Sequence, residues 1–254
     1  MTSSSPSSSH SDADTRDVTD RTQIDIALRA IVEGTAAVTG DDFFHSLVKH
    51  LATALHTRYA FVAECTDTPP TKAHILALWD GETFGPDHTY DLAGTPCEGV
   101  VAGQTCLYAQ DIQAFFPQNQ ALARMDLQSY LGVPLFDAEG QVLGHLVVMD
   151  ERPMSDDPRR ATILSIFAAR AGAELERQRA EARVRESEEQ FRSIIENATD
   201  GIAIANREGI LTYVSPSFGQ MLGYTAAELL GQSVAPLTHP DAHQPQYVHA
   251  GRSS

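Results

Sequence analysis

Apolar positions recur at helical spacing on either side of a central block, in which they follow the shorter period of strands. An apolar stripe predicts a helix over residues 41–55, and a similar stripe predicts an earlier helix over 22–34. Apolar runs in the central block predict strands over residues 58–65, 73–79, 83–92, 105–109, 129–136 and 141–149. This order predicts an α+β unit, in which one antiparallel sheet has terminal helices on one face and small helices on the other.

The last two strands of the block carry the strongest local signal. The turn Asp137-Ala138-Glu139-Gly140 predicts a hairpin, with Gly140 at the position that needs a positive φ. The strand after this turn is apolar on both faces, which predicts a central place in the sheet.

Two short helical segments are predicted before this hairpin. Residues 96–102 predict a short helix, with Thr95 and Glu98 forming a capping box at its start. Residues 111–125 predict helix and loop, interrupted at Pro117.

Residues 156–198 predict one long helix that organises the chain. Its first half carries an apolar stripe, whereas its second half is mostly charged, with Glu181 and Glu188 each four residues before an arginine. A helix that begins amphipathic and ends charged is expected to leave one domain and lead to another. Two different heptad registers fit either a paired strut with a stutter between them or a helix that is only solvated. One register contains Leu164, Ala168, Ala171 and Leu175, and the other contains Val184, Phe191 and Ile194.

Composition narrows the possible functions. A net charge of −16 argues against binding to nucleic acid or to anionic lipid. No apolar run approaches the roughly 20 residues of a membrane span, and the N-terminus lacks the apolar core of a secretory signal. The cysteines show no metal or disulfide spacing, and we therefore expect a cytoplasmic protein.

Three phrases of the central block resemble a bacterial GAF domain of the sensor-protein type. These are LAGTPCEGV from residue 92, CLYAQDIQAFFP from residue 106, and YLGVPLFDAEGQVLGHLVVMDERPM from residue 130. The resemblance implies a GAF-type antiparallel sheet flanked by helices, with a small-molecule pocket on one face.

The chain after the long helix resembles the N-terminal half of a PAS domain. Predicted strands over 202–205 and 210–214 are followed by a helix over 217–222 and by a capping box from Thr225 to Glu228. The phrases ENATDGI, GYTAAELLG and HPD stand in the order typical of that family. Its five-stranded sheet would be incomplete here, so we expect a partial PAS fold that is poorly stable alone.

These patterns together predict four segments. We expect a disordered Ser-rich tail over 1–20, a GAF domain over 21–178, the long helix over 156–198, and a truncated PAS domain over 188–254.

Cys97 is the sharpest candidate for a functional residue. It falls in the first turn of a short predicted helix, where unpaired N–H groups and the helix dipole lower a thiol's pKa. The resemblance places this helix over the ligand pocket, so a redox or ligand-contacting role is one interpretation. The interpretation that we favour is a small buried core residue, the usual state of a free cysteine. Cys106 is a conceivable disulfide partner, and Cys65 is assigned to packing.

Four other residues lie on strands that would line a GAF pocket. They are Trp79, Tyr108, Tyr130 and His145. Aromatic rings with a polar tip suit small-ligand sites, but core packing is their commoner role. The remaining histidines are scattered, and a metal site is not expected.

The cofactor stays unknown at this point. Cys97-Glu98 and Asp111-Ile112-Gln113 do not fit the bilin type of GAF domain, and an Asn-Lys pair of the cyclic-nucleotide type is missing. A photosensory flavin PAS domain would need a cysteine, and none occurs after Cys106.

Two interpretations of the function remain open. The first is a regulatory GAF–PAS module that senses a small ligand or a redox signal, forms a homodimer through residues 156–198, and signals to an output domain or response regulator. The second is the N-terminal part of an enzyme, a sensor histidine kinase or, as a weaker case, a diguanylate cyclase. No catalytic motif is found in the chain, and the cysteines do not resemble a GAF-type methionine sulfoxide reductase.

Overall fold

The computed structural model describes residues 41–235, apart from the side chain of Asp41. The predicted Ser-rich tail, the predicted helix over 22–34 and the HPD phrase of the PAS resemblance, which begins at His239, lie outside these residues. The described chain divides into two compact units, with the boundary along the chain between Ala180 and Glu181.

The first unit is built on a six-stranded antiparallel sheet in the order β3-β2-β1-β6-β5-β4. Its strands are β1 (Tyr59–Cys65), β2 (Lys72–Trp79), β3 (Thr89–Asp91), β4 (Cys106–Tyr108), β5 (Ser129–Phe136) and β6 (Val142–Asp150). The apolar strand β6 is central, and Gly140 in the hairpin before it has φ 81°, as predicted. The irregular strand predicted over 83–92 is correct only for β3, because most of that segment is loop.

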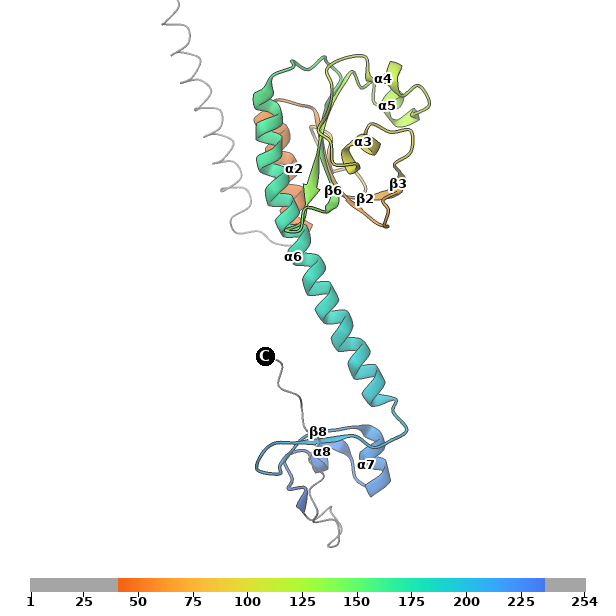
Figure 1. Ribbon diagram of the computed structural model, residues 1–254, viewed down its shortest axis with the longest axis vertical. Helices are drawn as coiled ribbons and strands as arrows, with labels where there is room; N and C mark the ends of the chain where they lie inside the picture. The colour runs from red at the N-terminus through yellow and green to blue at the C-terminus, as the bar shows by residue number, and fades with distance from the viewer. Residues whose placement is uncertain (1–40, 236–254) are drawn as a thin grey trace, which may run out of the picture. The chain divides into compact units, whose positions relative to one another are not determined.

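Helices cover both faces of this sheet (Figure 1). The long helices α2 (Asp41–Leu55) and α6 (Pro158–Glu196) pack on one face around Phe44, Leu47 and Phe167. The short helices α3 (Cys97–Val101), α4 (Ile112–Phe115) and α5 (Gln120–Arg124) cover the other face. The arrangement is the α+β architecture that the sequence predicts.

Helix α6 uses its apolar residues in two different ways. Leu164, Ala168, Ala171 and Leu175 are 0–4% exposed, because they pack against the sheet. They therefore cannot form the first half of a dimer seam, and that part of the sequence prediction is wrong. Val184, Phe191 and Ile194 are 59–70% exposed and lie further along the same helix.

The second unit contains a two-stranded antiparallel sheet and two short helices. Its elements are β7 (Ala203–Ala205), β8 (Leu211–Val214), α7 (Pro216–Leu222) and α8 (Ala226–Leu229). The predicted capping box is present, since Thr225 and Glu228 each bond the backbone N–H of the other. The buried core is small, consisting of Leu211, Val214 and Leu229 in the described residues.

Candidate functional site

A pocket of about 500 Å³ lies between the sheet and the short helices of the first unit. Sheet residues such as Phe61, Ile75 and Met149 form an apolar wall, and Leu122 of α5 faces them. Polar groups line it on the loop before β3 and on the segment that leads into α5. A pocket of this size, mostly apolar with a few polar groups, is typical of a small-molecule site.

A buried polar cluster forms one wall of the pocket. The hydroxyls of Tyr90 and Tyr130 both lie 3.4 Å from the Cys97 Sγ atom, within donor distance for sulfur. Tyr90 Oη also lies 2.6 Å from Nε2 of His145. Tyr90 has one hydroxyl hydrogen, so it satisfies both contacts when His145 Nε2 carries a hydrogen and donates it to Tyr90. The cluster joins three strands and a helix through side chains alone.

Local sequence explains how Tyr130 and Cys97 meet. Gly132 lies two residues after Tyr130 on β5, and a Cβ at Gly132 would stand only 2.5 Å from the Tyr130 hydroxyl. The missing side chain thus leaves room for the Tyr130 ring to lie along its own strand. Cys97 begins α3, whose residues Val100 and Val101 are buried in the same core and hold the helix against the sheet.

The capping box predicted for α3 is not formed. The Thr95 hydroxyl donates to the Leu92 carbonyl oxygen at 2.7 Å, and the Glu98 carboxylate accepts from Gly94 N–H at 3.2 Å. The N-cap residue is Pro96, in αR conformation and without a side-chain cap. The Thr95 and Glu98 side chains therefore bond to the backbone of the loop before the helix instead of to each other's N–H groups.

Burial raises the pKa of the Cys97 thiol, although hydrogen bonds from Tyr130 and Tyr90 act in the opposite direction. The lowered pKa that the helix N-terminus suggested is therefore wrong, because desolvation outweighs the hydrogen bonds to the thiol at a residue 4% exposed. Burial also raises the pKa of Cys106, and that of Cys65 to about 11. All three thiols are free, and a high pKa makes each a poor nucleophile near neutral pH.

His145 is fully buried on the pocket face of β6, between Phe61 and Tyr90. Burial lowers its pKa to about 3, so the imidazole is neutral over the physiological range. Its Nδ1 atom has no hydrogen-bond partner within the described residues. Nε2 is consequently the atom through which this histidine orients Tyr90.

The predicted pocket residues fall into three groups. Cys97 and Tyr130 line the pocket. His145 lies one hydrogen bond behind the wall, and the Tyr108 ring packs on Tyr130 with centroids 6.1 Å apart. Trp79 is on the opposite face of the sheet, against the α2 and α6 core, where the Lys49 ammonium lies 5.0 Å from its ring centre.

A β-bulge explains the position of Trp79. Ala63 pairs with Ile75 and Val62 pairs with Ala77, which leaves Leu76 as an extra residue in β2. The extra residue reverses the alternation, so Ile75 faces the pocket whereas Trp79, four residues later, faces the helices. Without the extra residue, Ile75 and Trp79 would lie on the same face of β2.

Tyr90 is the principal residue that sequence reasoning missed. Its strand has only three residues and lies in a polar segment, so the alternation of apolar residues could not predict on which face of the sheet Tyr90 lies. Its partner His145 is 55 positions away in the chain, and no local pattern connects them.

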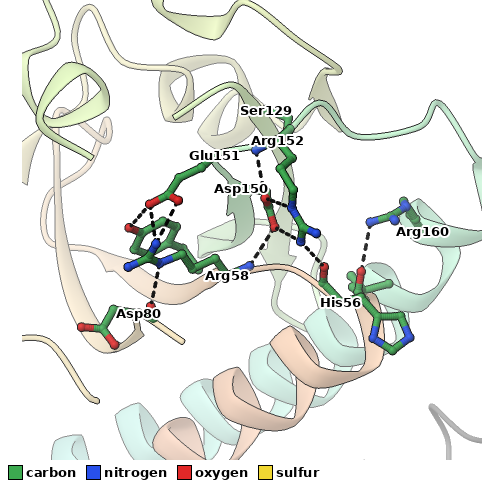
Figure 2. A network of polar contacts seen from close by, with 10 residues as sticks. His56, Arg58, Asp80, Ser129, Asp150, Glu151, Arg152 and Arg160 are labelled. Atoms are coloured by element: carbon green, nitrogen blue, oxygen red, sulfur yellow. Dashed lines mark hydrogen bonds and ion pairs between the residues drawn. The ribbon is translucent and has the colours of Figure 1, made fainter. Parts of the chain in front are cut away.

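A polar network connects the end of β6 to the long helices (Figure 2). The Asp150 carboxylate accepts from Arg58 N–H at 3.0 Å and from Arg152 Nε at 2.9 Å, and Arg160 of α6 donates to the Leu55 carbonyl at 3.1 Å. Burial alone would raise the pKa of Asp150, but hydrogen bonds from Arg152 and Arg58 hold it below its usual range. Asp150 directly follows Met149, a residue of the pocket wall. Arg152 also donates to the His56 carbonyl, next to Leu55, so the end of β6 and the start of α6 contact the same segment at the end of α2.

Residues 41–235 contain no group of three or more His, Cys, Asp or Glu side chains placed to hold a metal ion. No helix in this range is both long and apolar enough to cross a membrane.

Comparison with family models decides the classification. The GAF domain model matches residues 39–175, which is more than half of the chain. The chain belongs to the GAF family. In this GAF protein, a PAS fold model matches residues 189–251, so a PAS domain follows the GAF domain.

Solved structures confirm the GAF fold. A GAF domain from an Acinetobacter phosphoenolpyruvate-protein phosphotransferase is 18% identical, with a TM-score of 0.51, and the match covers 64% of this chain and 98% of that one. The GAF domain of the corresponding Coxiella burnetii protein is also 18% identical, with a TM-score of 0.51 and coverage of 65% and 98%. Identities this low establish the fold alone. A comparison with curated proteins gave no match.

Proposed function

We propose that this GAF–PAS chain is the sensory part of a signalling protein, and that a small molecule bound in the GAF pocket is its input. The observation that carries the proposal is the pocket itself, with apolar walls and a buried polar cluster at one side. The raised thiol pKa values favour this input over the alternative of a redox signal at Cys97. GAF and PAS domains together support a general sensory role.

The proposed route to the output follows β6 and α6. A ligand that moves Met149 would shift Asp150 and its partners, and Arg160 ties this region to the first turn of α6. Helix α6 then continues without interruption for 39 residues, a length of about 58 Å at about 1.5 Å per residue. The proposed receiver is an output domain of the sensor histidine kinase type, with a response regulator as its partner in a two-component phosphorelay in the cytoplasm.

The proposed function is tested by a thermal-shift screen of the full chain against pools of small metabolites. Ala121→Trp supplies the pocket-blocked variant, because Ala121 is an exposed residue of α5 at the pocket wall. Ala123→Trp is its matched control, since Ala123 is exposed on the same helix but does not line the pocket. A pool that raises the Tm of the wild type and of Ala123→Trp, but not of Ala121→Trp, supports the proposal. No such pool in a broad screen would contradict it.

The signalling unit is proposed to be a parallel homodimer paired along the outward face of α6. Ala180, Val184, Ser187, Phe191 and Ile194 follow each other at spacings of four and three residues, the pattern of a coiled-coil seam. All of them are exposed in the single chain. In a parallel pair, Arg183 beside this seam would face Glu188 of the second copy, a favourable charge pair.

Phe191→Glu is expected to dissociate this dimer, because it would bring two carboxylates into the seam. We expect the dimerisation constant to weaken by about 100-fold or more, measured by sedimentation equilibrium. Ala182→Glu is the control, since Ala182 is exposed on α6 but lies off the seam and should leave the constant unchanged. A wild-type chain that remains monomeric at high micromolar concentration would remove the basis for this part of the proposal.

A further inference from the structure

The chemistry of the pocket wall defines the class of ligand, provided that the proposed small-molecule function holds. No lysine or arginine within residues 42–235 lines the pocket. An anionic ligand would lose its hydration without gaining a counter-charge, and burial of an unpaired charge is costly. Among the described residues the only acidic side chain of the wall is Asp91, which is exposed and whose Oδ1 lies 3.8 Å from Lys72 Nζ. A cation at depth would likewise find no partner, so the wall favours an uncharged molecule.

The apolar part of the wall is rich in rings and thioethers. Phe61, Tyr90 and Tyr130 contribute aromatic surface, and Met125 and Met149 contribute sulfur. Aromatic molecules pack on such rings in offset or edge-to-face arrangements, and thioether sulfur makes favourable contacts with ring edges. These groups favour a flat aromatic molecule over a sugar, which needs many hydrogen-bond partners.

The polar cluster supplies an acceptor at one side of the pocket. The Tyr130 hydroxyl points its single hydrogen at Cys97 Sγ, and its oxygen keeps lone pairs that can accept a hydrogen bond. Both residues line the pocket, although each side chain is at least 95% buried. A ligand that carries one hydroxyl or N–H at its buried end would satisfy this oxygen without breaking the bond to Cys97.

We propose that the pocket selects an uncharged aromatic molecule with one hydroxyl or N–H donor, which it places against Tyr130 Oη. Phenols and indoles belong to this chemical class, whereas nucleotides and carboxylates are excluded from it. Specificity therefore has two sources. Among the described residues the wall has no lysine or arginine and only an exposed histidine, His88, so an anion finds no buried counter-charge, and the Tyr130 hydroxyl distinguishes a donor from a plain hydrocarbon.

The test compares three probes with one ring system: 2-naphthol, naphthalene and 2-naphthoate. Binding to the full chain is measured by ligand-observed NMR titration. We expect 2-naphthol to bind about 2- to 10-fold more tightly than naphthalene, the usual value of one neutral hydrogen bond. We expect 2-naphthoate to bind at least about tenfold more weakly than 2-naphthol, because its charge is uncompensated.

Variants test whether Tyr130 and the pocket cause these differences in affinity. Tyr130→Phe keeps the ring and should make 2-naphthol and naphthalene bind equally, within about twofold. Ala121→Trp should abolish binding of every probe, whereas Ala123→Trp should not. Equal binding of 2-naphthol and naphthalene to the wild type, or tight binding of 2-naphthoate, would overturn the proposed ligand class.

The two proposals fail in different ways. If none of the probes binds but the metabolite screen finds a compound sensitive to Ala121→Trp, the ligand class is wrong and the sensory pocket stands. If neither the probes nor the metabolite pools bind, both are wrong.

Discussion

Between about pH 7.5 and about pH 5, the GAF domain should lose about 2 kcal/mol of its free energy of unfolding through His145 alone. The folded protein keeps this imidazole neutral, because burial lowers its pKa to about 3. In the unfolded chain the pKa returns to about 6.5, so the unfolded state binds a proton that the folded state does not. The stabilising effect is complete above the unfolded pKa and is lost progressively as the pH falls toward the folded pKa.

Urea unfolding followed by tryptophan fluorescence measures this loss. Trp79 is the only tryptophan of the chain and packs in the core of the first unit, so it reports on that unit. His145→Gln is the test variant, because it cannot be protonated in this range and its amide can still reach Tyr90. We expect its free energy of unfolding to vary less over the same pH range, by about 2 kcal/mol. An identical pH dependence in the wild type and the variant would show that His145 does not cause the loss.

Gly144→Ala should destabilise the GAF domain by about 3 kcal/mol or more. Gly144 lies in the central strand β6, and a Cβ there would stand 2.1 Å from the Ala63 carbonyl oxygen and 2.9 Å from the Glu64 Cα. Both atoms belong to the backbone of the neighbouring strand β1, which cannot move without disturbing the sheet. The measurement is again urea unfolding, at constant pH.

Gly85→Ala is the matched control for this substitution. A Cβ at Gly85 would also make a close contact, 2.7 Å from Leu78 Cδ2, but this atom is the end of a half-buried side chain that can rotate. We expect a loss below about 1 kcal/mol. Similar losses for the two variants would mean that the backbone of β1 yields as easily as a leucine side chain.

The sequence predicted the GAF fold well because its strongest signals are local. The hairpin with Gly140 and the apolar stripes of α2 and α6 each depend on residues close in the chain, and each is present. The site was predicted only in part. The bulge at Leu76 reversed the face of Trp79, and Tyr90 joined the site through a contact with His145 across the sheet. Faces after a bulge and contacts between distant strands depend on pairing, which periodicity does not describe.

The capping boxes illustrate the same limit. Thr225 and Glu228 form theirs, whereas Thr95 and Glu98 have the same spacing and bond instead to Leu92 and Gly94. Pro96 is the N-cap of the helix near Thr95, and the loop before it takes up both side chains. One sequence pattern therefore has two outcomes, decided by the chain that precedes it.

The pocket divides into parts that evolution can change at very different cost. Its polar cluster is built into the core, where Tyr90, Tyr130, Cys97 and His145 depend on one another. Residues 118–121 also line the pocket; they include the Asn119 cap of α5 and are mostly exposed. Substitutions at exposed positions seldom change stability by more than about 0.5 kcal/mol. Related chains can therefore diverge in the molecules they admit while they keep the same buried hydrogen-bonding end.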